Sequence, residues 1–176
     1  RPLESRISGF SHAPFVKQLG GDQYKPDYAA LDRAERILLD AMTTRPGASA
    51  QHALGRLYLA KMEFDEAQTL FNAALQAEPD NAQIHSDLGA TLFEKWARER
   101  STIGAESEET KRQSLEHLTR AIRLNSKLPE AHFNLALLYQ SENQTQMARQ
   151  EWLNYLELDP DSTWAKEARD NLISLN

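Results

Sequence analysis

The sequence predicts an all-α fold, an α-solenoid in which antiparallel helix pairs stack into a right-handed superhelix. Apolar residues recur at helical spacing through most of the chain. Short stretches that contain Pro or Gly separate the helical segments. A set of small and large apolar residues also repeats about every 34 positions, a period typical of stacked helix pairs. We therefore expect three full repeats, a half repeat before them and a capping helix after them.

Residues 1–26 form an arm that differs from the rest of the chain, because prolines and glycines break every candidate helix in it. We expect this arm to be irregular, extended or looped. It carries too many large apolar residues for a solvated linker. We expect it to lie along the first helices, in the place of a missing helix, and to cover their exposed core edge; contact with a preceding domain is the alternative. These apolar residues are Leu3, Ile7, Phe10, Phe15 and Val16.

Residues 27–47 predict a half repeat with a single helix. Asp27 is a suitable N-cap, and Pro46 and Gly47 end the helix. Three small or apolar residues lie 33 positions before equivalent residues of the next repeat. The segment therefore corresponds to the second helix of a pair whose first helix is missing. The matching positions are Ala34, Leu38 and Ala41 before Ala67, Phe71 and Ala74.

Residues 48–81 predict the first complete repeat. The small residues Gly55 and Ala67 let its two helices approach closely, and Phe71 fills the wider gap beside them. The whole pattern is Leu54, Gly55, Tyr58, Ala67, Phe71, Ala74 and Pro79. It resembles the tetratricopeptide repeat family, with Gln51 where the family motif usually has Trp. The resemblance implies stacked helix pairs and a concave side that binds peptides.

Residues 82–128 predict a second repeat with an insertion. Ala121 lies 47 positions after Ala74, so about 13 residues have been added within this repeat. Because helical spacing continues on both sides, we expect two lengthened helices that join near residues 101–105 and protrude from the stack. The tip would carry Glu106, Glu108 and Glu109. A tolerated insertion is the simpler interpretation, and a docking element for a partner is the alternative.

Residues 129–161 predict the third repeat, and residues 162–176 predict the capping helix. Tyr155 stands where the first repeat has the small Ala74, so we expect looser packing against the helix that follows. The capping helix has apolar residues on one side and charged residues on the other, as the end of a stack requires. Its apolar side comprises Trp164, Ala168, Leu172 and Leu175.

The composition of the chain excludes several classes of function. Among 176 residues, 20 Lys and Arg stand against 26 Asp and Glu, and this net charge of -6 disfavours nucleic acid as a partner. Cysteine is absent, which excludes disulfides and thiolate chemistry. No apolar run is long enough for direct membrane insertion. Because the sequence begins at Arg1, we expect a piece of a longer protein, and cytoplasmic and periplasmic locations both fit.

The first helix of each repeat is expected to line a concave peptide-binding groove with a mixed polar and apolar surface. Phe93, Phe133 and Leu137 would each contribute roughly 1.5–3 kcal/mol if a partner covered them fully. The alternative is that they fill the inner curve or meet the chain termini. The predicted groove residues are His52, Arg56, Leu59, Gln83, Ser86, Ala90, Phe93, Glu130, Phe133, Asn134 and Leu137.

Some members of the family bind acidic chaperone tails through a clamp of basic and amide side chains. The corresponding positions include Arg56 and Asn134, which suit a carboxylate, but also Asp87 and Glu130, which repel it. An acidic chaperone tail is therefore disfavoured as a ligand. His85 and His132 occupy the same position in consecutive repeats, and His52 lies one residue away from it. A metal site built from them is also disfavoured, because this position normally packs between helices.

We therefore expect a protein-interaction module that holds a peptide or helix of a partner protein, without a cofactor and without catalysis. The alternatives are a structural spacer or an intramolecular regulatory region of a larger protein; a metal-binding or enzymatic domain is disfavoured because no nucleophile elbow or phosphate loop occurs. Homo-oligomerisation through the groove or the end repeats is a further possibility. The first ten residues also resemble the start of repeat regions in large bacterial multidomain proteins, some of which end in a CHAT protease domain.

Overall fold

The computed structural model describes residues 6–7, 16–19, 23–26, 28–99 and 105–175. A short β-hairpin precedes a succession of helices. The two strands are β1 (Val16–Leu19) and β2 (Gln23–Pro26). The helices are α1 (Tyr28–Thr44), α2 (Ala48–Lys61), α3 (Phe64–Ala77), α4 (Ala82–Glu99), α5 (Ala105–Leu124), α6 (Pro129–Ser141), α7 (Thr145–Leu158) and α8 (Thr163–Ser174).

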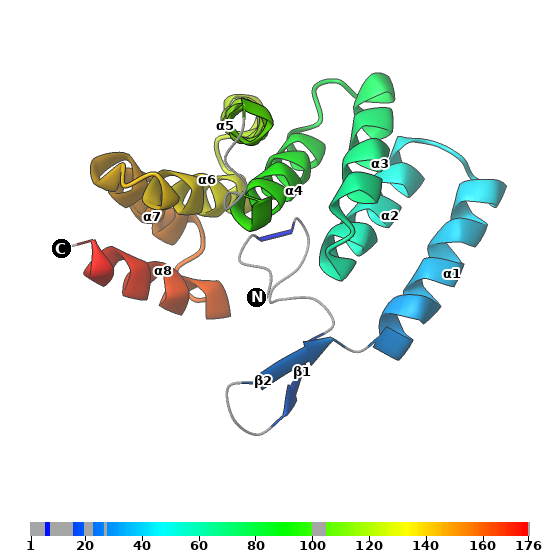
Figure 1. Ribbon diagram of the computed structural model, residues 1–176, viewed down its shortest axis with the longest axis horizontal. Helices are drawn as coiled ribbons and strands as arrows, with labels where there is room; N and C mark the ends of the chain where they lie inside the picture. The colour runs from blue at the N-terminus through cyan, green and yellow to red at the C-terminus, as the bar shows by residue number, and fades with distance from the viewer. Residues whose placement is uncertain (1–5, 8–15, 20–22, 27, 100–104, 176) are drawn as a thin grey trace.

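The helices form an arc in which each helix packs against the next along the chain (Figure 1). Contacts also connect α2 with α4 and α4 with α6, so the first helices of successive pairs lie next to one another. This is the α-solenoid that the sequence predicts, and the prediction of its fold class is confirmed. No helix in the described part of the chain is long and apolar enough to cross a lipid bilayer.

The β-hairpin corrects the prediction that the whole arm of residues 1–26 is irregular. Val16 pairs with Pro26 and Leu19 with Gln23, in an antiparallel register. Within its described residues, 6–7, 16–19 and 23–26, the arm contains no helix. An extended backbone must still satisfy its N–H and C=O groups, and a second extended strand supplies hydrogen-bond partners for them. The hairpin lies at the open side of the arc, between the N-terminal segment and α1 (Figure 1).

The close approach of paired helices depends on glycine. A Cβ atom added at Gly55 would lie 2.7 Å from Cε1 of Phe71, and one added at Gly89 would lie 2.6 Å from Cγ of Leu118. Both distances are far below van der Waals contact. The expectation that Gly55 lets α2 and α3 touch is therefore confirmed, and Gly89 has the same role between α4 and α5.

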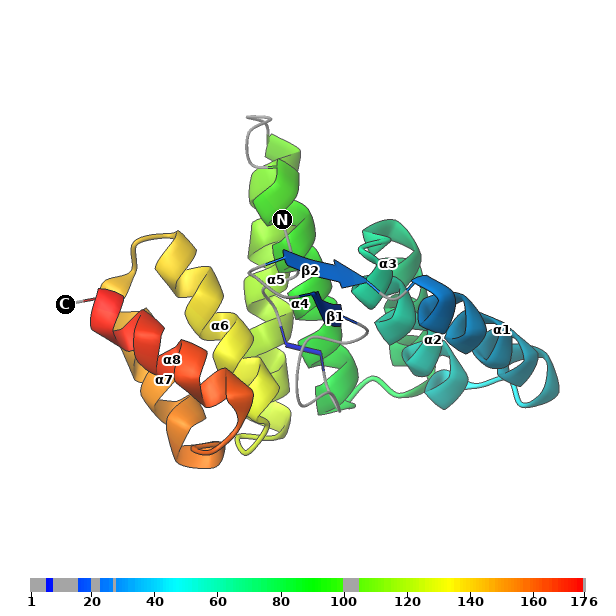
Figure 2. The same cartoon turned by 90° about the horizontal axis from the view of Figure 1, so that it is seen from below.

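The second helix pair is longer than its neighbours, as the insertion predicts. Helices α4 and α5 contain 18 and 20 residues, against 14 in each of α2 and α3. The pair extends beyond the rest of the arc (Figure 2). Lys95 forms an ion pair with Asp65 in the first repeat, and Lys111 forms one with Glu142 in the third. The neighbouring repeats thus hold the base of the extension from both sides, while residues 100–104 at its tip lie outside the described part of the chain.

The helix α8 closes the C-terminal end of the core. Trp164 and Ala168 are buried, whereas Lys166, Arg169 and Asp170 face solvent. Ser162 caps the helix, since its side-chain oxygen accepts a hydrogen bond from the main-chain N–H of Ala165. We propose that the chain divides into a half repeat, three full repeats and this capping helix at the boundaries that the sequence indicates.

Candidate peptide-binding groove

The N-terminal segment Arg6–Ile7 lies on the inner side of the arc, between the two ends of the solenoid (Figures 1 and 2). Both residues are buried, with Arg6 at 4% and Ile7 at 1% relative exposure. Arg6 contacts the third repeat and the capping helix. Ile7 instead belongs to the buried cluster that includes Leu59, Phe71 and Leu88 from the first and second repeats. Two consecutive residues of the arm thus reach both halves of the inner surface.

Asn134 holds the main chain of Arg6 through two hydrogen bonds. Its Oδ1 accepts from the Arg6 main-chain N–H at 2.7 Å, and its Nδ2 donates to the Arg6 carbonyl oxygen at 2.8 Å. The Asn134 side chain is fully buried on α6. An amide that pairs with both main-chain groups of one residue recognises backbone rather than a particular side chain. Asn134 can therefore orient any segment placed along this part of α6.

The side chain of Arg6 enters a pocket made of three aromatic rings and two carboxylates. Its Cζ lies 5.1 Å from the ring centre of Tyr155, 5.6 Å from that of Trp164 and 5.9 Å from that of Phe133. Its Nη1 donates to Asp159 Oδ2 at 3.0 Å, and its Nη2 lies 3.9 Å from Glu130 Oε1. The rings replace the lost hydration of the cation, and the carboxylates balance its charge. We call this set the arginine pocket: Glu130, Phe133, Tyr155, Asp159 and Trp164.

The pKa values of Asp159 and Tyr155 keep the arginine pocket in an ionisation state that suits a bound cation. Burial acts to raise the pKa of Asp159, but hydrogen bonds from Ser162 and Tyr155 and the charge of Arg6 outweigh it, so the pKa is lowered. Burial raises the pKa of Tyr155 to about 12. At neutral pH the pocket therefore combines a carboxylate with a neutral phenol that donates to Asp159 Oδ2 at 2.9 Å.

That the arm replaces a missing helix against the first helices stays a prediction, because Leu3, Phe10 and Phe15 lie outside the described residues. Leu31 of α1 packs on Leu54 and Leu57 of α2, so the half repeat buries one apolar side against the first complete repeat. The other side of α1 stays open to solvent, with Ile37 68% and Leu39 45% exposed. Of the described arm residues, Ile7 packs on the first and second repeats, and Arg6 meets buried acidic and amide groups of the third.

The predicted groove residues fall into three sets. Glu130, Phe133 and Asn134 surround Arg6. Leu59 and Ala90 share the cluster of Ile7, whereas Phe93 and Leu137 share the cluster of Phe133. The remaining members are His52, half-buried Arg56, fully buried Ser86 and exposed Gln83. Whether this set binds a partner stays a prediction.

A hydrogen bond connects the inner sides of the first two repeats. His52 Nε2 lies 2.8 Å from Asp87 Oδ2, and Asp87 is fully buried. Glu94 is also fully buried, one helical turn after Ala90. Together with Glu130 and Asp159, these carboxylates share the described inner surface with His52, Arg56 and Arg6. That an acidic chaperone tail does not suit this surface stays a prediction.

Sequence reasoning missed Tyr155, Asp159 and Trp164 as members of the site, because it restricted the groove to the first helix of each repeat. Tyr155 belongs to the second helix α7, and the other two lie in or before α8. One signal was available. Tyr155 occupies a position that holds a small residue in the first repeat, and the extra space expected there is where Arg6 packs on its ring.

The histidines that the sequence aligns in consecutive repeats have separate partners. His52 pairs with Asp87, His132 Nδ1 lies 2.6 Å from Glu151 Oε2, and His85 Nδ1 lies 2.9 Å from His117 Nδ1. Within the described ranges no group of three His, Asp or Glu side chains could hold a metal ion. The histidines therefore act as packing and hydrogen-bonding residues between helices.

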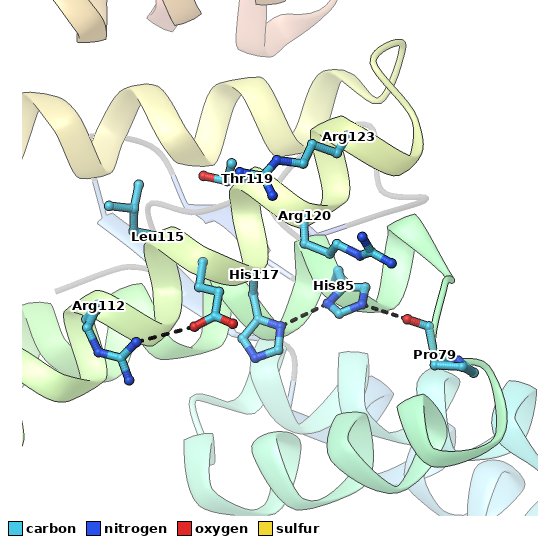
Figure 3. Close-up of a pocket in the computed structure, with 9 residues that line it drawn as sticks. Pro79, His85, Arg112, Leu115, His117, Thr119, Arg120 and Arg123 are labelled. Carbon is cyan, nitrogen blue, oxygen red and sulfur yellow. Dashed lines mark hydrogen bonds and ion pairs between the residues drawn. The ribbon is translucent and has the colours of Figure 1, made fainter.

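The pair of His85 and His117 lies in an outer pocket of about 560 Å³ beside the turn between α3 and α4 (Figure 3). His85 Nε2 lies 3.0 Å from the Pro79 carbonyl oxygen and donates a hydrogen bond to it. His85 therefore offers Nδ1 as the acceptor, and His117 donates. Burial and the charge of His85 lower the pKa of His117 to about 4, against the opposing effect of Glu116.

Replacing His117 with Gln is expected to weaken the loss of stability in mild acid. The folded pKa of His117 is about 4 and the unfolded value is 6.5, so between these pH values the unfolded chain binds a proton that the folded chain does not. Stability therefore falls as the pH drops from 6.5 to 4, by on the order of 1 kcal/mol for this group. Urea denaturation at several pH values would measure the change.

His132 offers a control of opposite sign. Burial, the largest single cause, acts to lower its pKa, but the hydrogen bonds that it donates to Glu151 and to the Ser126 carbonyl oxygen, together with the charge of Glu151, raise the pKa above 6.5. Its contribution to stability is present below that pH and is lost as the pH rises through the folded pKa. His132→Gln should therefore steepen the loss in acid, and a parallel response of both variants would contradict the assignment.

Comparisons with known proteins agree with this architecture. Residues 48–91 and 129–162 each match the family described as tetratricopeptide repeat. Superkiller complex protein 3 is similar in mouse, with 29% identity over 111 residues, and in human, with 26% identity over 122 residues. These matches cover 62% and 69% of this chain but 7% of each relative. The chain thus spans less than a tenth of the length of those relatives.

Three solved structures share the fold. The first is the first repeat domain of Spaghetti (RPAP3) bound to the HSP90 peptide SRMEEVD, with a TM-score of 0.60 and 17% identity over 73% of this chain and 91% of that chain. The Arabidopsis OM64 domain gives 0.61 and 16% over 73% and 95%, and MamA gives 0.60 and 19% over 84% and 85%. At these identities the likeness concerns the fold, and the resemblance to bacterial CHAT-type proteins stays a prediction.

Proposed function

Because residues 48–91 and 129–162 are tetratricopeptide repeats, we propose that the chain is a protein-interaction module whose concave groove holds a segment of a partner protein. One observation carries the proposal. Asn134 already binds the two main-chain groups of a non-helical residue on the inner side of the arc. Groove residues that can hold this segment of the same chain have the chemistry needed to hold a similar segment of another protein.

The contacts of Arg6–Ile7 indicate how binding energy arises in the groove. Asn134 contributes two hydrogen bonds, each with a net value of about 0.5–1.5 kcal/mol. Ile7 contributes the burial of an aliphatic side chain, worth about 1.5–3 kcal/mol when complete. A short segment can therefore bind through one backbone clamp and a few side chains, as interfaces with few dominant residues do.

The second candidate function is an intramolecular regulatory region, and the same contacts favour it. A groove that holds its own N-terminal segment connects the solenoid to whatever sequence surrounds that segment.

We propose no catalytic role, since the buried histidines and carboxylates of the described residues pair with one another in structural contacts. The net charge of -6 supports a protein partner over nucleic acid.

Selection from a phage-displayed library of random peptides tests the groove. We expect the selection to enrich peptides that bind the wild-type chain or its Arg6→Ala variant. The substitution Asn134→Ala should weaken the binding of these peptides by at least about tenfold, because two hydrogen bonds are lost. Arg123→Ala, on the exposed outer side of α5, serves as the control and should bind as the wild type does. Circular dichroism establishes that each variant is folded. Enriched peptides that bind Asn134→Ala equally well, or a failure to enrich any peptide, would contradict the proposal.

A further inference from the structure

We propose that the arginine pocket makes the groove selective for a partner segment in which Arg precedes an aliphatic residue, and that Arg6–Ile7 is an intramolecular competitor for that segment. The inference rests on the proposed peptide-binding function. It goes further by naming the side chains that the partner presents and the part of this chain that it displaces. The occupant is a partner protein, and the N-terminal segment shows the chemistry that the partner must match.

The arginine pocket fits a guanidinium better than an ammonium. Arg6 lies within 6 Å of three aromatic ring centres at once, an arrangement that suits a flat, weakly hydrated cation. Its side chain is only 5% exposed. A lysine would carry a compact, strongly hydrated charge into the same site and would lose more hydration energy. The pocket should therefore distinguish the two basic residues.

The position after the arginine selects an aliphatic side chain. Ile7 is 1% exposed and shares its buried cluster with Leu59, Leu88 and Leu92 from the first helices of two repeats. A polar side chain here would lose its hydration without a hydrogen-bond partner from these apolar neighbours. The backbone clamp of Asn134 at Arg6 fixes the register, so that the next residue meets this cluster.

The wider charge of the groove also favours a basic ligand. Asp87 and Glu94 are fully buried on α4, and Glu130 and Asp159 lie beside the guanidinium of Arg6. A cation entering the arginine pocket meets the carboxylates of Glu130 and Asp159, which lower the cost of its desolvation. A partner segment rich in Asp and Glu would meet the same carboxylates with the opposite result.

The bound N-terminal segment lowers the apparent affinity for a partner. A partner can bind only those molecules in which the N-terminal segment has left the groove, which we call the open form. The apparent dissociation constant equals the intrinsic one divided by the fraction of molecules in the open form. A groove that is open about a tenth of the time would therefore bind a partner about tenfold more weakly than an unoccupied one. Removing the Arg6 side chain should shift the chain toward the open form without altering the residues that receive the ligand.

The test uses the full chain and a fluorescent synthetic peptide with the sequence of residues 1–10. We expect the peptide to bind the Arg6→Ala chain at least about tenfold more tightly than the wild-type chain, as measured by fluorescence anisotropy. Arg33→Ala, at an exposed position on α1, is the matched control and should bind as the wild type does. In the Arg6→Ala chain, a second substitution, Asp159→Asn or Asn134→Ala, should reverse the gain.

Variants of the peptide test the selectivity. A peptide with Lys at position 6 keeps the positive charge but lacks the guanidinium. A peptide with Ala at position 6 still contains Arg1, so it tests whether any arginine is sufficient. Both should bind at least about tenfold more weakly than the parent peptide. The parent peptide should also raise the melting temperature of the Arg6→Ala chain more than that of the wild type. This thermal readout separates an open groove from a misfolded chain.

Several outcomes would overturn the inference. Equal binding to the wild-type and Arg6→Ala chains would show that Arg6–Ile7 does not compete, and equal binding of the Lys peptide would exclude a guanidinium-selective pocket. A wild-type dimer in light scattering that Arg6→Ala dissociates would show exchange of the segment between copies. If displayed peptides bind through Asn134 but lack arginine, this inference fails and the proposed function stands; if no peptide binds at all, both fail.

Discussion

Replacing Trp152 with Ala is expected to lower the free energy of unfolding by about 3–5 kcal/mol. Trp152 is fully buried on α7, and its ring packs edge-on against Phe133 with a centroid distance of 4.8 Å. Its indole Nε1 donates to Gln140 Oε1 at 3.0 Å, so the substitution removes packing and leaves an amide oxygen without this donor. Urea denaturation followed by circular dichroism would measure the loss.

The adjacent Leu153 provides a matched control for this substitution. It lies on the same helix but is 49% exposed, so Leu153→Ala should cost less than about 1 kcal/mol. Because Phe133 packs on Trp152 and also lines the arginine pocket, Trp152→Ala should additionally weaken peptide binding to the groove. Similar losses of stability at both positions would contradict the view that Trp152 closes a layer of the core.

Replacing Gly89 with Val is expected to destabilise the fold by about 2–3 kcal/mol through overpacking. A Cβ at this position would lie 2.6 Å from Cγ and 3.1 Å from the main-chain N of Leu118, and Leu118 is fully buried. Neither atom belongs to a flexible side-chain end, so α4 and α5 must move apart. The small gain in helix propensity from Gly to Val is less than about 1 kcal/mol and does not compensate.

A double-mutant cycle isolates this steric cause. Leu118→Ala removes three carbon atoms and Gly89→Val adds three, so the double variant restores the volume between the helices. We expect its destabilisation to be at least about 1 kcal/mol less than the sum of the two single changes. Ala77→Val, at an exposed position on α3, should change stability by less than about 0.5 kcal/mol. Additive losses at Gly89 and Leu118 would show that the clash is not responsible.

The helical part of the fold could be predicted because its signals are local. The spacing between Gly55 and Phe71 already indicates a close contact between two helices of one hairpin, and the same spacing recurs between Ala136 and Trp152 in the third repeat. The insertion was visible as a longer interval between Ala74 and Ala121. The β-hairpin in the arm was not predicted, since its strands lie among prolines and glycines that indicate only the absence of a helix.

The candidate site could be predicted only in part. Glu130, Phe133 and Asn134 follow from the helical period of α6, and the structure places all three around Arg6. The arginine pocket as a whole could not be derived in this way. Tyr155 and Trp164 belong to other helices, and the sequence does not show that their rings converge.

The sequence by itself determined the stacked helix pairs, because each pair is specified by small and large residues within about three dozen positions. Only the tertiary structure decided what lies in the groove. Arg6 and Asn134 are 128 positions apart, and their contact depends on the curvature that the whole stack of repeats produces. Helix propensity and periodicity do not specify that curvature. The contact between the buried cation of Arg6 and the buried amide of Asn134 can therefore be identified only from the tertiary structure.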